Sequence, residues 1–184
     1  MRIEKLKGGS HMKVQIICDT REQKNNHIIK AFKKHDISFI TEKLDIGDYA
    51  MFIPDTNHKC KTIYERKASL EELSANLCEP KDHNNHNRFE RELIRAKEQG
   101  IKVVLCIENP NWYEDLMNWR YRTKLKPKAF RGMLLSLASR YDLKVVGVSK
   151  EYIGSFIYNT LYYELREELK GENLTNDSTT NKSY

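Results

Sequence analysis

The sequence has no long apolar run and few cysteines. No stretch of its 184 residues approaches the roughly 18 to 20 consecutive apolar residues that span a bilayer, and none shows the basic start, apolar stretch and small cleavage site of a signal peptide. The four cysteines, Cys18, Cys60, Cys78 and Cys106, occur without C-x-x-C spacing. We therefore expect a soluble intracellular protein that has no membrane partner and keeps its thiols reduced.

The chain is long enough for one hydrophobic core. With 184 residues and 39% hydrophobic content, it can bury one core and hardly two. The opening residues end in Gly-Ser-His-Met, which is typical of a cloning junction before a native start at Met12, so we assign residues 1–11 to a vector-derived tag or linker. Residues 12–170 then form a single domain, and the polar residues 171–184 are expected to be a disordered tail.

Basic residues exceed acidic ones, which favours a polyanionic partner. The formal net charge is +6 and the isoelectric point is about 9.0. One segment combines cations with aromatic side chains: Trp112, Trp119, Arg120, Tyr121, Arg122, Lys124, Lys126 and Lys128. This mixture suits phosphate contact and base stacking, and a helix-to-helix connection with a solvated basic side explains it equally well.

Apolar periodicity predicts an α/β protein with a central sheet flanked by helices. Strands are predicted over residues 13–18, 37–40, 48–53, 62–66, 101–108 and 144–148, and helices over residues 26–35, 70–77, 87–99 and 152–169. The three strands between residues 37 and 66 are expected to form an antiparallel meander beside the first strand, which makes the sheet mixed.

Charged residues gather at the ends of two strands of this predicted meander. They are Gly47-Asp48-Tyr49 and Glu65-Arg66-Lys67. Because side chains alternate along a strand, Glu65 and Lys67 project from one side and Arg66 from the other. If the two strands pair, the carboxylates of Asp48 and Glu65 converge and can bind Mg²⁺, while Lys67 orients the nucleophile or the phosphate in phosphodiester hydrolysis. For an isolated Glu-x-Lys triplet, a solvated strand end is the alternative interpretation.

A third charged cluster favours the catalytic interpretation. Asp19, Arg21 and Glu22 follow the first predicted strand, and α/β sheets commonly carry their sites at the C-terminal ends of strands. The three clusters are therefore expected to share one end of the sheet.

The three clusters, in their order along the chain, resemble three sequence elements of the XPF-type structure-specific endonucleases. The nuclease domain of that family carries D-x-R-E, GDY and E-R-K-x-x-x-D elements. They read Asp19-Thr20-Arg21-Glu22, Gly47-Asp48-Tyr49 and Glu65-Arg66-Lys67-Ala68-Ser69-Leu70-Glu71, with Glu71 in place of the usual final aspartate. The similarity continues through Arg88-Phe89-Glu90-Arg91-Glu92 and the strand that ends at Glu108, so it covers roughly residues 13–150.

The resemblance implies a restriction-endonuclease-like core in which Mg²⁺ or Mn²⁺ serves to cut DNA, with a preference for flaps, forks or junctions. The implied catalytic residues are Asp19, Arg21, Glu22, Asp48, Glu65, Arg66 and Lys67. The implied metal ligands are Asp19, Glu22, Asp48 and Glu65, and the arginines Arg21 and Arg66 are expected near phosphate. With the basic segment, expected DNA contacts are Arg88, Arg120, Arg122, Lys124 and Lys128.

Cellular relatives usually append helix-hairpin-helix modules, and only a short polar tail follows Leu169. The chain therefore resembles bacterial or phage forms, which implies bacterial or phage-infected cytoplasm and only modest selectivity for branched DNA. A homodimer held by apolar faces of the helices after Glu108 is expected, particularly through residues 152–169, because that helix is richer in apolar residues than one sheet face needs. A helicase, a recombinase or a single-strand-binding protein is the expected further partner, in DNA repair, recombination or replication.

Two other functions fit the same residues. A catalytically silent DNA-binding or scaffold subunit is disfavoured because Asp48, Glu65 and Lys67 are all present, and a sequence-specific restriction-type nuclease lacks an identifiable base-reading element. A zinc site built from Cys78, His83 and His86 would lack a fourth ligand with regular spacing.

Overall fold

The computed structural model describes residues 13–180, with side chains up to residue 171. The predicted tag at residues 1–11 and the last four residues lie outside this range. The strands are β1 (Gln15–Cys18), β2 (Phe39–Thr41), β3 (Tyr49–Ile53), β4 (His58–Lys59), β5 (Thr62–Lys67), β6 (Lys102–Ile107) and β7 (Lys144–Gly147). The helices are α1 (Asn26–Lys34), α2 (Leu70–Leu77), α3 (Arg88–Glu98), α4 (Trp112–Met117), α5 (Pro127–Tyr141) and α6 (Ile153–Thr180).

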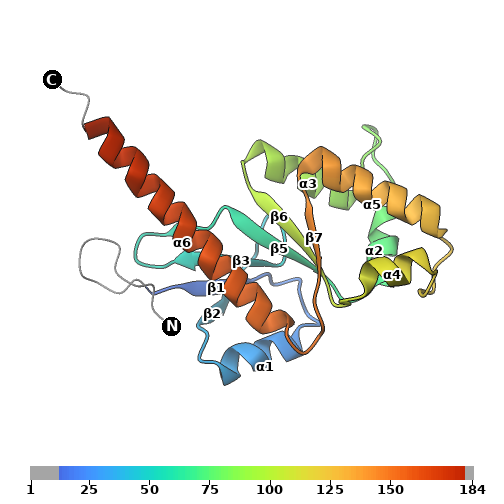
Figure 1. Cartoon of the computed structure of the whole chain (residues 1–184), viewed down its shortest axis with the longest axis horizontal. Helices are drawn as coiled ribbons and strands as arrows, with labels where there is room; N and C mark the ends of the chain where they lie inside the picture. Colours follow the sequence, from blue (N-terminus) through green and yellow to red (C-terminus); the bar gives the residue numbers. More distant parts are fainter. Residues whose placement is uncertain (1–12, 181–184) are drawn as a thin grey trace.

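Within the described range, the strands form one mixed seven-stranded sheet. Its order is β2-β1-β3-β5-β6-β7, and β4 pairs with β3 (Figure 1). β3 is antiparallel to both β1 and β5, whereas β5, β6 and β7 run parallel. The C-terminal ends of β1 and β5 therefore lie beside the N-terminal end of β3, at one end of the strands. Below, this end is called the edge of the sheet. The predicted pairing of the strand that begins near Asp48 with the strand that ends at Lys67 is confirmed.

The second strand departs from the predicted meander. β2 pairs parallel with β1, with Ile16 opposite Phe39. The reason is that α1 carries the chain back along the sheet between the two strands, and a strand-helix-strand unit leaves its strands parallel. β2 is consequently an outer strand, and β1 lies between β2 and β3.

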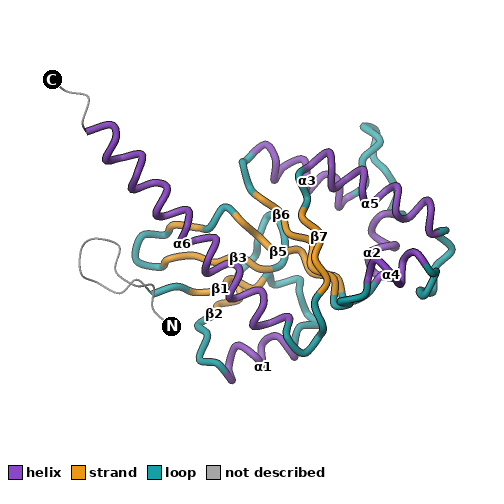
Figure 2. Tube along the Cα trace, in the orientation of Figure 1, coloured by secondary structure: helices purple, strands orange, loops and turns teal. Residues whose placement is uncertain are grey.

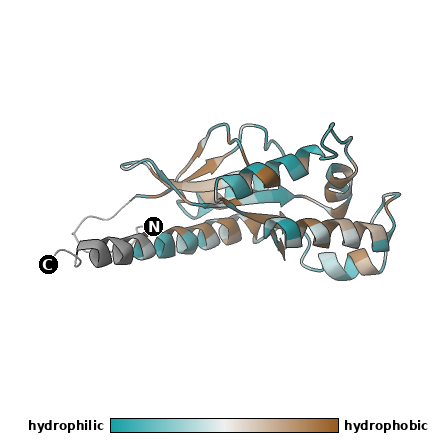
Figure 3. Ribbon diagram, turned by 90° about the horizontal axis from the view of Figure 1, so that it is seen from above, coloured by the Kyte–Doolittle hydropathy of each residue, from teal (hydrophilic) through white to brown (hydrophobic). Residues whose placement is uncertain are grey.

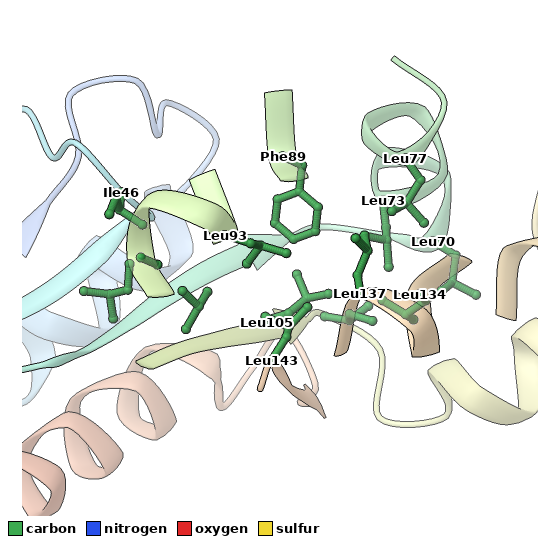
Figure 4. Close-up of a cluster of buried hydrophobic side chains, with 14 of the residues drawn as sticks. Ile46, Leu70, Leu73, Leu77, Phe89, Leu93, Leu105, Leu134, Leu137 and Leu143 are labelled. Atoms are coloured by element: carbon green, nitrogen blue, oxygen red, sulfur yellow. The ribbon is translucent and has the colours of Figure 1, made fainter. Parts of the chain in front are cut away.

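Helices cover both faces of the sheet (Figure 2). α1 and α6 pack on one face, where Phe32 and Ile157 are fully buried. α2, α3 and α5 pack on the other, where Leu73 of α2 and Leu93 of α3 lie around Leu105 of β6 (Figure 4). Below we call these the α1/α6 face and the α2/α3 face. Burying two apolar layers on one sheet gives the α/β architecture that the sequence predicted.

The two helices beside the edge where Asp48 and Lys67 meet begin with side-chain caps. The Ser69 hydroxyl accepts a hydrogen bond from the backbone N–H of Glu72, and the Asn87 side chain accepts one from the backbone N–H of Glu90. These caps place the first turns of α2 and α3 close to the end of β5. The predicted bounds of α2 agree with the structure.

Helices α4 and α5, between β6 and β7, were not predicted. In α5, Phe130, Leu134 and Leu137 are buried, yet Leu135 is 46% exposed. Apolar residues on both sides of this helix leave no single stripe for periodicity to detect. The 15 residues of α5 begin with Pro127 at the first helical turn, a position where proline is well tolerated.

The structure of α6 corrects one expectation. Its apolar stripe is already covered within the chain, because Ile153, Ile157, Leu161 and Leu165 are 0% exposed. A homodimer cannot use that stripe. The bounds of α6 extend to Thr180, and no proline interrupts it. Figure 3 shows the coloured part of this helix running along one side of the sheet. None of the described helices has the length and apolarity needed to cross a membrane.

Candidate active site

Asp48 links strands β3 and β5 at the edge of the sheet. The preceding Gly47 has φ +72°, and a Cβ atom there would lie 3.1 Å from the Tyr64 carbonyl oxygen, so glycine permits this close approach to β5. The backbone N–H of Asp48 donates to that carbonyl at 2.8 Å. Its carboxylate oxygen Oδ2 accepts a hydrogen bond from the backbone N–H of Arg66 at 2.7 Å. Asp48 is thus held from two sides by the backbone of β5.

The predicted alternation of side chains along β5 is confirmed. Glu65 and Lys67 lie on the α2/α3 face, where Lys67 Nζ donates to Glu65 Oε1 at 2.6 Å and lies 5.8 Å from the centre of the Phe89 ring. Burial lowers the pKa of Lys67, but the charge of Glu65 outweighs it and raises that pKa above its ordinary value. The ammonium group therefore stays charged beside the carboxylate.

Arg66 forms buried ion pairs on the opposite, α1/α6 face. Its Nη2 and Nε donate to Glu22 Oε1 at 2.6 and 3.1 Å, and its Nη1 donates to Glu108 Oε1 at 3.0 Å. The same oxygen of Glu108 lies 2.5 Å from Nε2 of His27, on α1. Only 2% of the Arg66 side chain is exposed. The guanidinium group of Arg66 therefore holds two acids of the chain itself, Glu22 and Glu108.

The D-x-R-E element forms a loop organised around Asp19. One carboxylate oxygen of Asp19 accepts from the backbone N and Nε of Arg21 at 2.7 and 2.8 Å. The other accepts from Leu44 N at 2.6 Å and from Arg21 Nη2 at 3.1 Å. Burial raises the pKa of Asp19, but these bonds lower it below the ordinary aspartate value. Because its side chain is 0% exposed and takes four donors, Asp19 anchors the loop with both carboxylate oxygens.

A cavity of about 150 Å³ opens at this edge of the sheet. It is lined by Arg21, Glu22, Gly47, Asp48, Glu65, Arg66, Lys67, Glu72, Arg88 and Glu92. All the implied catalytic residues except Asp19 line this cavity, and so does Arg88. Sequence reasoning missed Glu72 and Glu92. The only signal for Glu92 was its place in the Arg88-Phe89 run, and nothing singled out Glu72.

The acids of the cavity repel one another. The pKa of Asp48 is raised well above its ordinary value, first by burial and then by the charge of Glu65. The same two causes raise the pKa of Glu92. Burial also raises the pKa of Glu22, although the charge of Arg66 opposes it. A bound divalent cation would relieve this repulsion.

The carboxylates suit Mg²⁺ or Mn²⁺, in a smaller set than implied. Asp48, Glu65 and Glu22 each use one oxygen for the bonds given above, and their other oxygens, Oδ1, Oε2 and Oε2, accept no hydrogen bond from the described residues. No three His, Cys, Asp or Glu side chains between residues 13 and 171 come together as a complete metal site, so the implied set of four acids is not assembled. Mg²⁺ needs only one or two carboxylates, with water and substrate phosphate as further ligands, and Asp48 with Glu65 meets that need.

The residues expected to contact DNA lie in two places. Arg88 borders the cavity with 55% of its side chain exposed and pairs at 3.4 Å with Glu79. The others lie in the segment from Trp119 to Lys128, between α4 and the start of α5, and comprise Arg120, Arg122, Lys124 and Lys128, all exposed. Arg120 differs from the rest of this basic segment because it forms ion pairs with Glu114 at 3.0 Å and Asp115 at 3.5 Å.

The basic segment is attached to α2, next to the cavity. Glu71 Oε1 accepts a hydrogen bond from the backbone N–H of Arg122 at 2.8 Å, and the Ser74 hydroxyl bonds that of Thr123 at 3.1 Å. Glu71, which stands in place of the family aspartate, therefore holds the basic segment, whereas its neighbour Glu72 lines the cavity. The segment thus lies on the same side of the molecule as the cavity entrance formed by α2.

Comparisons with known proteins agree with this geometry. The pattern of the ERCC4 domain matches residues 18–160. XPF from Aeropyrum pernix has a similar fold, with a TM-score of 0.59 and 17% identity, over 87% of this chain and 69% of that one. XPF from Aeropyrum pernix in complex with DNA has a TM-score of 0.58 and 17% identity, over 84% of this chain and 66% of that one. This chain thus spans about two thirds of their length. No curated protein matches in sequence. The restriction-endonuclease-like fold is confirmed.

Proposed function

The chain belongs to the ERCC4 domain family and has its nuclease fold, and from this premise we propose that it is a divalent-metal-dependent endonuclease that prefers branched DNA. The observation that carries the proposal is the arrangement of Asp48, Glu65 and Lys67 around one cavity. Two carboxylates with free oxygens and one buried ammonium group are what metal-assisted phosphodiester hydrolysis requires.

In the proposed reaction, Asp48 and Glu65 would hold Mg²⁺ or Mn²⁺. When bound, the metal makes water a stronger nucleophile at neutral pH and neutralises charge that develops on the phosphate. Lys67 remains charged beside Glu65, so its ammonium group can contact the phosphate or orient the attacking water. Arg21 and Arg88, half exposed at the cavity, supply positive charge for the neighbouring phosphates.

The basic segment is the proposed path of the DNA beyond the cavity. Arg122, Lys124 and Lys128 are exposed and form no ion pair within the described residues, so their charge is available to phosphates. Such contacts do not depend on base sequence. A flap or fork bends into the small cavity at lower deformation cost than continuous duplex, which favours cleavage at branches. A helicase, recombinase or single-strand-binding protein would strengthen this preference.

A homodimer remains part of the proposal, through a surface other than α6. On α5, Leu135 is 46% exposed, and the small residues Ala129, Gly132, Ser136 and Ser139 are exposed beside it at helical spacing. Small side chains allow close helix approach across a symmetric contact. Light scattering should give twice the 21.8 kDa of one chain, and Leu135→Lys should shift it toward one chain. A wild-type monomer at micromolar concentration would contradict the dimer.

The decisive experiment measures cleavage of labelled duplex, flap, fork and four-way-junction DNAs with Mg²⁺, with Mn²⁺ and with EDTA. We expect cleavage only with a divalent ion, and faster cleavage of flaps and forks than of duplex. Activity in EDTA would place the chemistry elsewhere. Binding without cleavage would favour the silent subunit, and cleavage confined to one base sequence would favour the restriction-type enzyme.

A further inference from the structure

Glu108 is a buried acid that lies outside the cavity and outside the three charged motifs. It follows the last residue of β6, and only 3% of its side chain is exposed. Its backbone N–H donates to the Lys67 carbonyl oxygen at 2.9 Å, and its carboxylate accepts from Arg66 Nη1 at 3.0 Å. His27 closes the far side of the carboxylate from α1. Glu108 is therefore attached to both cationic members of the Glu65-Arg66-Lys67 triplet.

Arg66 connects Glu108 to the cavity through two separate contacts. Its guanidinium group holds Glu22 Oε1 through Nη2 and Nε, and its backbone N–H holds Asp48 Oδ2. A planar guanidinium group gripped at both ends has one orientation, because its donors have a fixed fork geometry. If the Glu108 end is released, no other hydrogen bond among the described residues fixes the Nη1 end of the guanidinium plane that presents Glu22 to the cavity.

We infer that Glu108 is a positioning residue, which acts through Arg66 to hold Glu22, and with it the cavity wall, in place for metal and phosphate. This inference rests on the proposed function. Glu108 itself lies behind Arg66 and does not line the cavity. Residues of this kind, one shell behind the ligands, commonly change metal affinity or activity by about 10- to 100-fold when replaced.

The test is a double-mutant cycle with Glu108→Gln, Glu22→Gln and the pair together. Mn²⁺ binding is measured by calorimetry without DNA, flap cleavage by single-turnover rates, and folding by thermal unfolding. We expect Glu108→Gln to weaken Mn²⁺ binding and slow cleavage by about tenfold. In the Glu22→Gln background it should have little further effect, because the group that it positions has already been changed.

The matched control is Glu90→Gln. Glu90 is equally buried and ion-paired, with Arg140 and Tyr141 as partners, but it lies between α3 and α5 and does not line the cavity. Its replacement should lower the unfolding temperature without changing Mn²⁺ affinity or the cleavage rate. The control therefore separates loss of stability from loss of positioning.

Two outcomes would overturn the inference alone. One is a Glu108→Gln protein that binds Mn²⁺ and cuts like the wild type. The other is a cycle in which the effects of Glu108→Gln and Glu22→Gln simply add. A wild-type protein that neither binds Mn²⁺ nor cuts any DNA would instead overturn the proposed function, and this inference with it.

Discussion

The two faces of β5 use adjacent charged residues for different purposes. On the α2/α3 face, Glu65 and Lys67 pair with each other and face a cavity. On the α1/α6 face, Arg66 is held between Glu22 and Glu108. Burial does not distinguish the faces, because all three residues are at most 7% exposed. The difference lies in the partners: Lys67 pairs with one acid, its neighbour Glu65, whereas Arg66 joins two acids from other parts of the chain.

The different partners on its two faces allow the short strand β5 to be both stable and reactive. Arg66 pairs with two acids, and such a buried network stabilises the fold only while all its members are present. The opposite face keeps Asp48 and Glu65 close enough for mutual repulsion, as the raised pKa of Asp48 records. We call the α2/α3 side of β5 the reactive face and the α1/α6 side the closed face. Loss of a carboxylate at the reactive face should therefore affect activity most, and loss of the Arg66 cation at the closed face should affect folding most.

The largest expected effect is on activity, from Asp48→Asn on the reactive face. Removal of one of the two carboxylates proposed to bind the metal should slow cleavage by about 10³- to 10⁴-fold, roughly 4 to 5.5 kcal/mol of activation free energy. Single-turnover cleavage of a flap checks this, with the exposed neighbour Asp45→Asn as the control that keeps wild-type rates. Unimpaired cleavage by Asp48→Asn would remove this residue from the site.

The same substitution should leave folding intact. Burial and then the charge of Glu65 raise the pKa of Asp48, so folding favours its protonated form. Protonated Asp48 adds to the free energy of unfolding, and this contribution is fully present below the ordinary aspartate pKa of about 4. The contribution is lost as the pH rises through the raised pKa of Asp48. In metal-free protein at neutral pH, Asp48→Asn should therefore match or exceed the wild-type unfolding temperature, and the advantage should fade in acid.

The next largest effect is on stability, from Arg66→Met on the closed face. This change leaves Glu22 and Glu108 buried without their cation, which should cost about 3 to 5 kcal/mol of the free energy of unfolding. Lys67→Met leaves only one acid, Glu65, without its cation and should cost less, about 1 to 3 kcal/mol. Urea unfolding of both variants measures the contrast. An equal or reversed order would contradict the division between the two faces.

A smaller effect should show how far the reactive side extends along the basic segment. Lys124→Ala and Lys128→Ala should each reduce the slope of log affinity against log salt by roughly 0.7 to 0.9, because each removes one phosphate contact. Arg120→Ala is the matched control, since Glu114 and Asp115 already neutralise its charge, and it should change the slope less. Equal slopes for all three variants would show that the segment is a solvated connection.

The smallest effect concerns thiol reactivity, which should differ between the two faces. Cys18, Cys60 and Cys106 belong to the core of the α1/α6 face, and burial raises the pKa of each thiol to about 12. They remain protonated and inaccessible near pH 8. Cys78, at the end of α2, is exposed. One thiol should react in the native protein and four after denaturation, and Cys78→Ser should remove the native reaction.

Local sequence was sufficient for much of the fold. The bounds of α2 and the strand character of β1, β5 and β6 were predicted from short segments, of which β1 and β6 are nearly continuous apolar runs. The opposite directions of Glu65 and Arg66 follow from the two-residue repeat of a strand. The three motifs also supplied seven of the ten residues that line the cavity, all except Glu72, Arg88 and Glu92. Helix bounds, strand character and side-chain directions depend on residues close together in the chain, so local backbone geometry decides them.

Tertiary structure decided which charges are available for chemistry. Motif order could not show that the oxygens of Asp19 accept hydrogen bonds from Arg21 and Leu44, or that Arg66 forms an ion pair with Glu108. It also could not show that the apolar stripe of α6 is covered within the chain. Each of these depends on contacts between residues far apart in sequence. Whether a carboxylate binds a metal or closes a loop depends on which donors the rest of the fold brings to it, and only the packed molecule determines those donors.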